Sequence, residues 1–376
     1  MPPKKRPGEV RDAIVKVLTT HPKGVSVSEI ERGVESILGP TAHSSIRSYL
    51  RLNSKTLFAR MERAQYTLRE FLPVAQRARL PERQQSMQEH RFGNSTLVHG
   101  DCLEWLAKRE QLSVHAVVTD PPYGLLEYTE EQQQKLRAGR GGIWRIPPSF
   151  DGAKRSPLPR FTVLSIDDVR AIEEFFLVWA RTLLPVLVPG ANVVVASNPL
   201  LSYVVSTAMA KAGLERRGEI ARLVMTMRGG DRPKAAHEEF SGVSVMPRSM
   251  WEPWLVFRRP IEGRVQDNLR KWKTGGFRRP SAERPFGDVI QSSPTRSSER
   301  AIAPHPSLKP QAFLRQLVRG ILPLGEGVVF DPFAGSGSTL AAAEAVGYTS
   351  IGIEKDGTYF DIARKALPRL AALPTD

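Results

Sequence analysis

The chain has 376 residues and carries 54 Lys or Arg against 39 Asp or Glu, a formal net charge of +15. This length suffices for one large α/β domain and a smaller one, and the excess positive charge favours a polyanion such as nucleic acid as partner. The single cysteine, Cys102, excludes an intrachain disulfide and a cysteine zinc site, so we expect no metal. Without a long apolar run or a hydrophobic signal core, we expect a cytoplasmic, nucleoid-associated protein.

The first 72 residues predict three helices followed by a hairpin, at 11–20, 29–38 and 42–52 and then at 57–60 and 66–68. Ser28 is expected to cap the second helix. This order resembles a winged helix whose third helix enters a DNA groove, and its candidate contacts are Ser45, Arg47 and Arg51. A winged helix used for protein contacts is the alternative. Residues 73–95 are polar and predict a linker or a solvated helix.

A strand at 96–100 precedes Asp101, whose simplest role is to cap a helix at 103–108. The next apolar run, 114–119, predicts a strand buried on both faces, and Asp120-Pro121-Pro122-Tyr123-Gly124 follows it. Two prolines make this a rigid turn at the carboxyl end of a sheet strand, where open α/β folds bind ligands. An acidic oxygen, prolyl carbonyls and a ring suit the amino group of an exposed nucleobase. The alternative is a tight turn with a packed tyrosine.

Residues 167–257 alternate helix and strand patterns, which predict a doubly wound sheet. The expected helices are 167–187 and 200–212, and the expected strands are 192–196, 219–227 and 254–257.

A second glycine-rich turn follows a strand at 327–330 and opens a helix at 340–346. It comprises Asp331, Pro332, Phe333, Ala334, Gly335, Ser336, Gly337, Ser338 and Thr339. Strand, glycine turn and helix place backbone N–H groups where a polar ligand binds, although the spacing fits neither the dinucleotide fingerprint nor a P-loop. Glu354 ends the next strand, the usual position for gripping a ribose diol.

Together the two turns resemble those of the amino-group DNA methyltransferases, which methylate the exocyclic nitrogen of adenine or cytosine with S-adenosylmethionine. The Asp120 motif precedes the glycine motif, an order similar to that of the family's β group. The resemblance covers residues 97–370. It implies a Rossmann-like doubly wound α/β methyltransferase sheet in circularly rearranged motif order at 96–376, in addition to the small N-terminal winged-helix domain. A homodimer is a further expectation from the resemblance.

The resemblance also assigns roles. The implied catalytic residues are Asp120, Pro121, Pro122 and Tyr123. Asp120 and the Pro121 carbonyl would accept hydrogen bonds from the amino group of a flipped base, and Tyr123 would stack on the ring of that base. The nitrogen could then attack the methyl group without a covalent enzyme intermediate. The implied S-adenosylmethionine contacts are Asp101, His305, Ser307, Lys309, Asp331, Phe333, Ala334, Gly335, Ser336, Gly337, Ser338, Thr339 and Glu354. In this set Lys309 is expected to pair with the cofactor carboxylate.

Two segments are candidates for DNA contact. Residues 125–162 leave the catalytic turn and are expected to close over the flipped base or the DNA backbone through Arg140 and Arg145. Residues 258–300 hold 11 Lys or Arg against 5 Asp or Glu and occupy the family's target-recognition position. Their candidate contacts are Arg270, Lys271, Lys273, Arg278 and Arg279. A solvated insertion is the alternative.

The aspartate-first motif favours adenine N6 over cytosine N4, because in the resembled enzymes a serine-first motif accompanies cytosine. Methylation of cytosine carbon 5 needs a cysteine nucleophile, and Cys102 lies outside the catalytic motif. An RNA or a protein amino group as substrate, or a non-catalytic DNA-binding regulator, stays as an alternative.

Overall fold

The computed structural model describes residues 9–21, 24–52, 58–61, 65–68, 87–122, 166–228, 236, 238–245, 247, 249–305 and 307–375. The chain divides into two compact units, residues 1–84 and 85–376. Each unit is described by itself.

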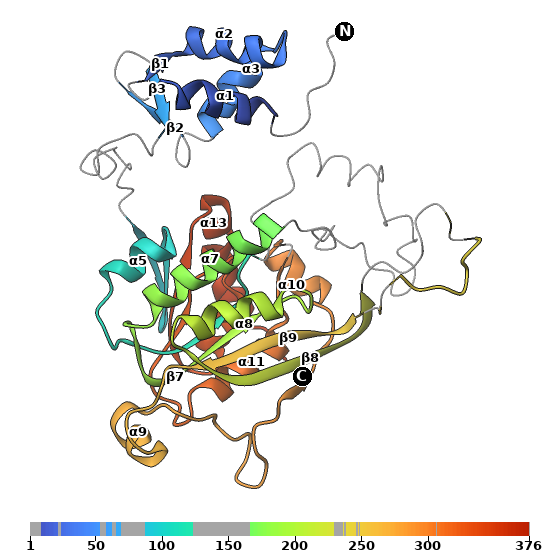
Figure 1. The fold of residues 1–376 in the computed structure, drawn as a ribbon. Helices are drawn as coiled ribbons and strands as arrows, with labels where there is room; N and C mark the ends of the chain where they lie inside the picture. Colours follow the sequence, from blue (N-terminus) through green and yellow to red (C-terminus); the bar gives the residue numbers. More distant parts are fainter. Residues whose placement is uncertain are drawn as a thin grey trace. The chain divides into compact units, whose positions relative to one another are not determined.

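The N-terminal unit packs three helices beside a small antiparallel sheet of order β1-β3-β2 (Figure 1). Its elements are α1 (Glu9–Thr19), β1 (Val25–Ser26), α2 (Val27–Leu38), α3 (His43–Leu52), β2 (Phe58–Arg60) and β3 (Gln65–Leu68). Ile14, Ile30 and Phe58 are fully buried in its core. The expected order of helices and hairpin is confirmed in these elements, whereas the winged-helix assignment and its role on DNA stay predictions.

The predicted cap of the second helix is wrong by two residues. Ser26 caps α2: its hydroxyl accepts from the Glu29 amide at 3.3 Å, and its own amide donates to the Glu29 carboxylate at 2.8 Å. This reciprocal capping box satisfies two backbone donors at the helix start, and Ser28 already lies inside the helix.

The second unit is built on a nine-stranded sheet of order β10-β8-β9-β7-β6-β11-β12-β5-β4, in which β4 and β9 run antiparallel to the rest. Its strands are β4 (Gln88–Phe92), β5 (Ser95–His99), β6 (Val114–Thr119), β7 (Leu187–Ala196), β8 (Glu215–Arg228), β9 (Ser249–Arg258), β10 (Val289–Gln291), β11 (Val328–Asp331) and β12 (Thr349–Glu354). The carboxyl ends of the parallel strands therefore share one edge of the sheet.

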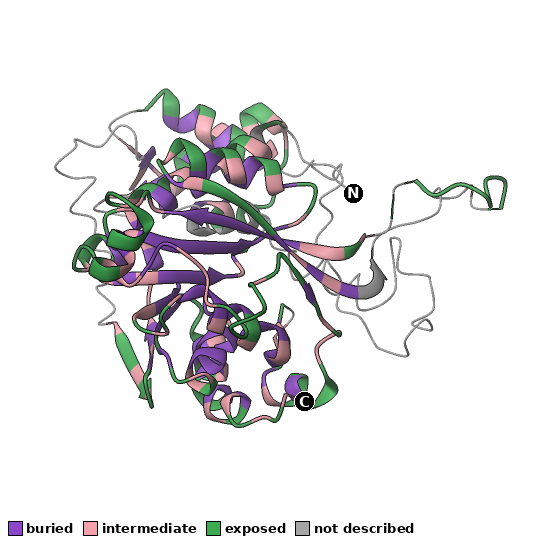
Figure 2. Ribbon diagram, turned by 90° about the horizontal axis from the view of Figure 1, so that it is seen from below, coloured by how far each residue is buried: buried purple, intermediate pink, exposed green. Residues whose placement is uncertain are grey.

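Helices cover both faces of this sheet, so its central strands are buried (Figure 2). The helices are α5 (Cys102–Lys108), α7 (Ile166–Leu183), α8 (Ser202–Lys211), α9 (Val265–Trp272), α10 (Ser297–Ile302), α11 (Gln311–Ile321), α12 (Ser338–Ala345) and α13 (Gly357–Ala371). Successive residues of a strand face opposite layers: Val117 of β6 packs with α7, and Val118 packs with α11. This arrangement confirms the predicted doubly wound sheet.

Several elements differ from the sequence prediction. The predicted linker, 73–95, contains β4, an edge strand with largely exposed side chains that pairs with β5 through its backbone and so lacks an apolar pattern. Helix α7 ends at Leu183, and β7 already begins at Leu187. The predicted insertion 258–300 contains α9, β10 and most of α10 rather than irregular chain alone.

Candidate functional site

Neighbouring parallel strands bring the two predicted turns together. β6 ends at Thr119 and β11 ends at Asp331, and the two strands pair directly. The Thr119 hydroxyl donates to Asp331 Oδ1 at 2.7 Å, and the Phe333 amide donates to the same oxygen at 3.1 Å. Asp331 is buried, and this burial raises the pKa of its carboxyl to about 6. The Asp331 carboxyl therefore pins the glycine turn to the strand that carries Asp120.

The glycine turn depends on backbone conformations that other residues rarely adopt. Gly335 and Gly337 have φ of +52° and +80°, and a Cβ at Gly335 would lie 3.2 Å from His305 Nε2. The Gly335 amide donates to Glu354 Oε2 at 2.7 Å, and the Asp356 amide donates to Oε1 at 2.7 Å. Burial raises the pKa of Glu354 to about 7. A half-buried carboxyl thus stands beside the turn, where the sequence predicted it.

The remaining residues of the turn fill the space between strand and helix. Phe333 packs against Phe175 and Trp179, with ring centroids 6.0 and 5.6 Å apart. Ala334 is buried, and Ser338 and Thr339 form the first turn of α12. The hydroxyl of Ser336 is buried and has no hydrogen-bond partner among the residues that the structure describes.

Asp101 has the capping role that its position suggested. Its Oδ1 accepts from the amides of Leu103 and Glu104 at 2.9 and 3.4 Å, and its Oδ2 accepts from Lys355 at 2.6 Å. Although burial opposes it, the hydrogen bond from Lys355 holds the pKa of Asp101 below its usual value. A contact of Asp101 with the cofactor stays a prediction.

His305 and Ser307 lie at the rim of the glycine turn. The His305 ring meets Tyr359 edge-on, with centroids 4.4 Å apart, and its Nδ1 accepts from the Ser307 amide at 3.2 Å. Burial lowers the pKa of His305, which favours the neutral ring. Tyr359, on α13, was not singled out from the sequence, because nothing local marks it as part of a site.

Lys309 faces the other turn. Its Nζ lies 2.5 Å from Asp120 Oδ2 and 3.3 Å from Glu252 Oε1, and the side chain is 11% exposed. The sequence predicted a cofactor carboxylate as the partner of Lys309, and that role stays a prediction. Pro121 is buried and Pro122 is exposed, whereas Tyr123 lies outside the described residues.

Two charged residues beside Asp120 were missed from the sequence. Arg222 of β8 and Glu252 of β9 are cross-strand partners joined at 2.9 Å, with side chains 3% and 12% exposed. The available sequence signal at Arg222 was a charged residue inside an otherwise apolar strand pattern. Its role could not be assigned from the sequence, because its partner Glu252 is placed beside it only by the pairing of β8 with β9.

The predicted DNA contacts fall into two groups. Arg140 and Arg145, with the whole segment 125–162, lie outside the described residues, and the side chains of Ser45 and Arg51 on α3 do as well. The others form contacts within the protein: Arg47 with Glu31, Arg270 with Asp267, Lys271 with Glu262, Arg278 with the Tyr348 hydroxyl, and Arg279 with the Ser281 carbonyl. Lys273 ends α9 in a left-handed conformation. DNA contact stays a prediction for all of them.

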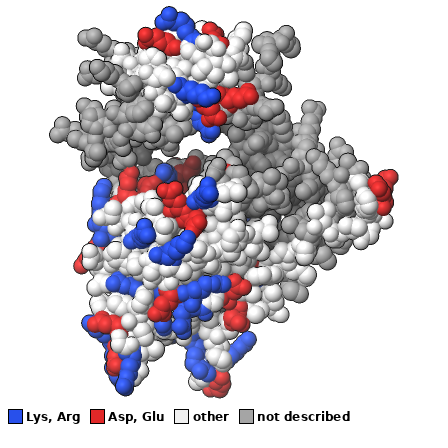
Figure 3. Space-filling model, in the orientation of Figure 1, with Lys and Arg blue, Asp and Glu red and all other residues white. Residues whose placement is uncertain are grey.

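Helix α9 lies at the opposite edge of the sheet from Asp120. Asn268 on α9 donates to the Pro189 carbonyl near the start of β7 at 3.1 Å, whereas Asp120 follows the carboxyl end of the neighbouring β6. Some six strand residues separate these ends, about 20 Å at the usual rise. The face drawn in Figure 3 shows basic side chains interspersed with acidic ones rather than gathered in one patch.

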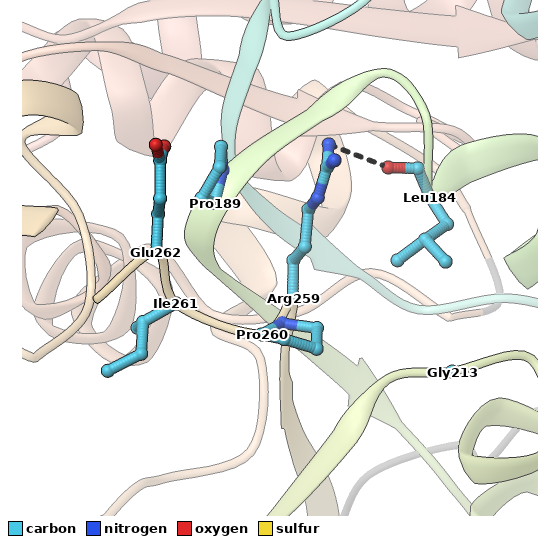
Figure 4. Close-up of a pocket in the computed structure, with 7 residues that line it drawn as sticks. All are labelled: Leu184, Pro189, Gly213, Arg259, Pro260, Ile261 and Glu262. Atoms are coloured by element: carbon cyan, nitrogen blue, oxygen red, sulfur yellow. Dashed lines mark hydrogen bonds between the residues drawn. The ribbon is translucent and has the colours of Figure 1, made fainter. Parts of the chain in front are cut away.

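A hollow of about 420 Å³ lies at this same far edge (Figure 4). It is lined by Leu184, Pro189, Gly213, Arg259, Pro260, Ile261 and Glu262. The Arg259 guanidinium donates to the Leu184 carbonyl at 3.1 Å and to the Leu187 carbonyl, so it holds the backbone before β7. The hollow is therefore remote from the two turns.

Cys102, the first residue of α5, packs in the core, and burial raises the pKa of its thiol to about 12. Such a thiol is not a thiolate nucleophile at neutral pH. Within the described ranges, no cluster of three or more His, Cys, Asp or Glu could bind a metal ion, and no helix is long and apolar enough to cross a membrane.

Comparison with known proteins gives a consistent set of relatives. Residues 114–365 match the N6/N4 methylase family, described as DNA methylase. The chain is 24% identical over 276 residues to the type II methyltransferase M2.DpnII of Streptococcus pneumoniae, covering 72% of this chain and 88% of that protein. It is 24% identical over 305 residues to the type II methyltransferase M.HindIII of Haemophilus influenzae, covering 71% and 93%.

Solved structures of DNA methylases also match. The complex of M1.HpyAVI with S-adenosylmethionine has 19% identity and a TM-score of 0.46, covering 73% of this chain and 98% of that one. The cytosine-N4-specific PvuII methyltransferase has 15% identity and a TM-score of 0.47, covering 75% and 88%.

Proposed function

The chain belongs to the N6/N4 DNA methylase family, and on this premise we propose that it methylates the N6 amino group of a flipped adenine in duplex DNA. Whichever base it modifies, the protein is a site-specific DNA methyltransferase that uses S-adenosylmethionine. The choice of adenine and the roles of individual residues belong to the proposal.

One observation supports the proposal above all others. The Asp120 turn and the glycine turn follow adjacent parallel strands and are joined by the hydrogen bond from Thr119 to Asp331. A base amino group at the first turn and a methyl donor at the second would therefore meet at one edge of the sheet. Placing two reactants side by side in this way supplies much of a catalyst's rate.

The residues at the glycine turn fit S-adenosylmethionine. Gly335 and Gly337 give the turn its left-handed backbone next to His305 and Ala363, and the buried Ser336 hydroxyl lacks a described partner. Glu354 would hold the ribose hydroxyls, and Phe333 and His305 would border the cofactor. When bound, S-adenosylmethionine supplies an electrophilic methyl group.

The other turn would prepare the base. An amino group inside a duplex is inaccessible, so the base must be extruded at a cost of a few kcal/mol. Asp120 and the Pro121 carbonyl would accept the two amino hydrogens, and Tyr123 would stack on the ring. These hydrogen bonds return electron density to the nitrogen, whose lone pair is otherwise shared with the ring. No covalent bond to the protein is needed, in keeping with the buried, protonated Cys102.

Adenine is proposed over cytosine because the motif begins with an aspartate, Asp120, rather than a serine. Cytosine N4 is the second candidate, since the same acceptor geometry suits either amino group. A DNA-binding domain at residues 1–72, a catalytic domain whose sheet begins with β4, a homodimer and a cytoplasmic location complete the proposal. Because α9 lies at the far edge of the sheet, we expect Arg270 and Lys273 to add little to DNA binding.

The test is transfer of labelled methyl from S-adenosylmethionine to unmethylated duplex DNA, followed by digestion to nucleosides and mass spectrometry. The expected product is N6-methyladenine. N4-methylcytosine would overturn the choice of base. Label on RNA or protein, with none on duplex DNA, would overturn the substrate class.

A further inference from the structure

Four side chains of alternating charge form a continuous series of contacts that begins at Arg222 on β8 and ends at Asp120. We call this series the charge chain. Arg222 pairs with Glu252 at 2.9 Å, Glu252 with Lys309 at 3.3 Å, and Lys309 with Asp120 at 2.5 Å. No side chain among them is more than 15% exposed. Buried ions need partners with good geometry, so each member depends on the next.

The fold anchors the charge chain at the end remote from Asp120. Arg222 and Glu252 face each other across β8 and β9. The Arg222 guanidinium also donates to the Ser292 hydroxyl and the Ser293 carbonyl, at 3.0 and 3.3 Å, and lies over the Phe313 ring. A planar guanidinium bound on several sides has little freedom, so Arg222 is a fixed support.

Glu252 is held as firmly. Its Oε2 accepts from both Arg222 and the Trp254 indole, the latter at 3.2 Å, and its Oε1 faces Lys309. Although burial alone would lower it, the carboxylates of Asp120 and Glu252 raise the pKa of Lys309. Lys309 is therefore a cation between two carboxylates.

These contacts fix the orientation of the acceptor. The Lys309 ammonium holds Asp120 Oδ2, which sets the plane of the carboxylate, and Glu252 sets the position of the ammonium. If Glu252 lost its charge, Arg222 and Lys309 would face each other as like charges without an anion between them. The ammonium would then shift, and the Asp120 carboxylate with it.

We propose that Arg222, Glu252 and Lys309 are positioning residues that orient Asp120 as the acceptor of hydrogen bonds from the substrate amino group. This inference rests on the proposed role of Asp120. Glu252 acts through Lys309 and touches neither the base nor the methyl donor.

The chain offers a matched control on the same two strands. Arg258 and Glu215 are also cross-strand partners of β9 and β8, joined at 2.6 Å, but they lie at the opposite edge of the sheet. The experiment compares Glu252→Gln with Glu215→Gln in the full chain. It measures the single-turnover rate of methyl transfer at saturating S-adenosylmethionine and duplex DNA, the Kd of each ligand, and the Tm.

Glu252→Gln should slow single-turnover methyl transfer about tenfold or more and change the Kd for DNA by less than about twofold, because orientation affects the reaction more than binding. Glu215→Gln should stay within about twofold of wild type in both. A Glu252→Gln rate equal to that of the control would overturn the inference. Absence of methyl transfer by the wild type would instead refute the proposed function itself.

A second pair of variants keeps the test valid if Glu252→Gln lowers the Tm. Lys309→Met removes the cation, whereas Lys309→Arg preserves it. Without its cation the Asp120 carboxylate loses the contact that sets its plane. Single-turnover methyl transfer at saturating ligands should therefore be about tenfold or more slower in Lys309→Met and recover in Lys309→Arg. A Lys309→Met rate equal to that of the wild type would overturn the inference.

Discussion

Asp331 and Asp120 follow neighbouring parallel strands, yet their surroundings are opposite. Asp331 is buried without a cation among its described contacts, accepts from Thr119 and Phe333, and has its pKa raised to about 6. Asp120 is partly exposed and is held by Lys309 at 2.5 Å. Asp331 thus pins the two turns together, whereas Asp120 has the surroundings that our proposal assigns to the acceptor of the substrate's hydrogen bonds.

The largest expected effect comes from removing the acceptor. Asp120→Ala should lower the methyl-transfer rate by roughly a thousandfold or more, because preorganised acceptors are usually the largest catalytic contribution. DNA affinity should stay within about twofold, since the carboxylate adds no positive charge to the phosphate contacts. A filter-binding titration beside the activity assay checks both, and retained activity would refute the catalytic assignment.

Glu354 is expected to make stability depend on pH. Its folded pKa is about 7 against an ordinary value of 4.5, so the folded state binds more protons between these values. Stability should therefore fall as pH rises through this window, by up to about 3 kcal/mol. Glu354→Gln should flatten the dependence of Tm on pH and weaken S-adenosylmethionine binding. Asp267→Asn, which alters an exposed pair with Arg270, serves as control. An unchanged slope would contradict the assigned burial of Glu354.

The smallest effect is expected at the far edge of the sheet. Neutralising Arg270 and Lys273 should weaken DNA binding by less than about threefold at physiological salt. The slope of the logarithm of the binding constant against the logarithm of the salt concentration should fall by less than about one for each residue neutralised. Titrations at several salt concentrations measure this. A large loss of affinity would show that DNA reaches α9 and would favour the predicted recognition role of residues 258–300.

Much of the fold was predictable because local patterns agree with it. The runs at β6, β7 and β11 are buried on both faces and therefore continuous in sequence. Strand β4 was missed because an edge strand needs no apolar alternation. The cap at Ser26 was missed because two serines precede Glu29, and the one that forms the capping box with it is Ser26, three residues before it.

The site was predictable where its chemistry is local. The Asp120 turn and the glycine turn are each contiguous, and their order in the chain identifies the family. Arg222 and Glu252 could not be assigned, because their meaning depends on strand pairing and on Lys309, which lies far along the chain. Pairing across a sheet depends on the whole fold and cannot be read from local sequence patterns.

The most direct measurement is the single-turnover rate of Asp120→Asn and Asp331→Asn at saturating S-adenosylmethionine. If Asp331 only pins the glycine turn, its variant should bind the cofactor more weakly but recover to within about tenfold of the wild-type rate once saturated. Asp120→Asn should stay roughly a thousandfold slower at any cofactor concentration. An Asp120→Asn rate that saturation restores, together with an Asp331→Asn rate that it does not, would reverse the two roles and contradict the account.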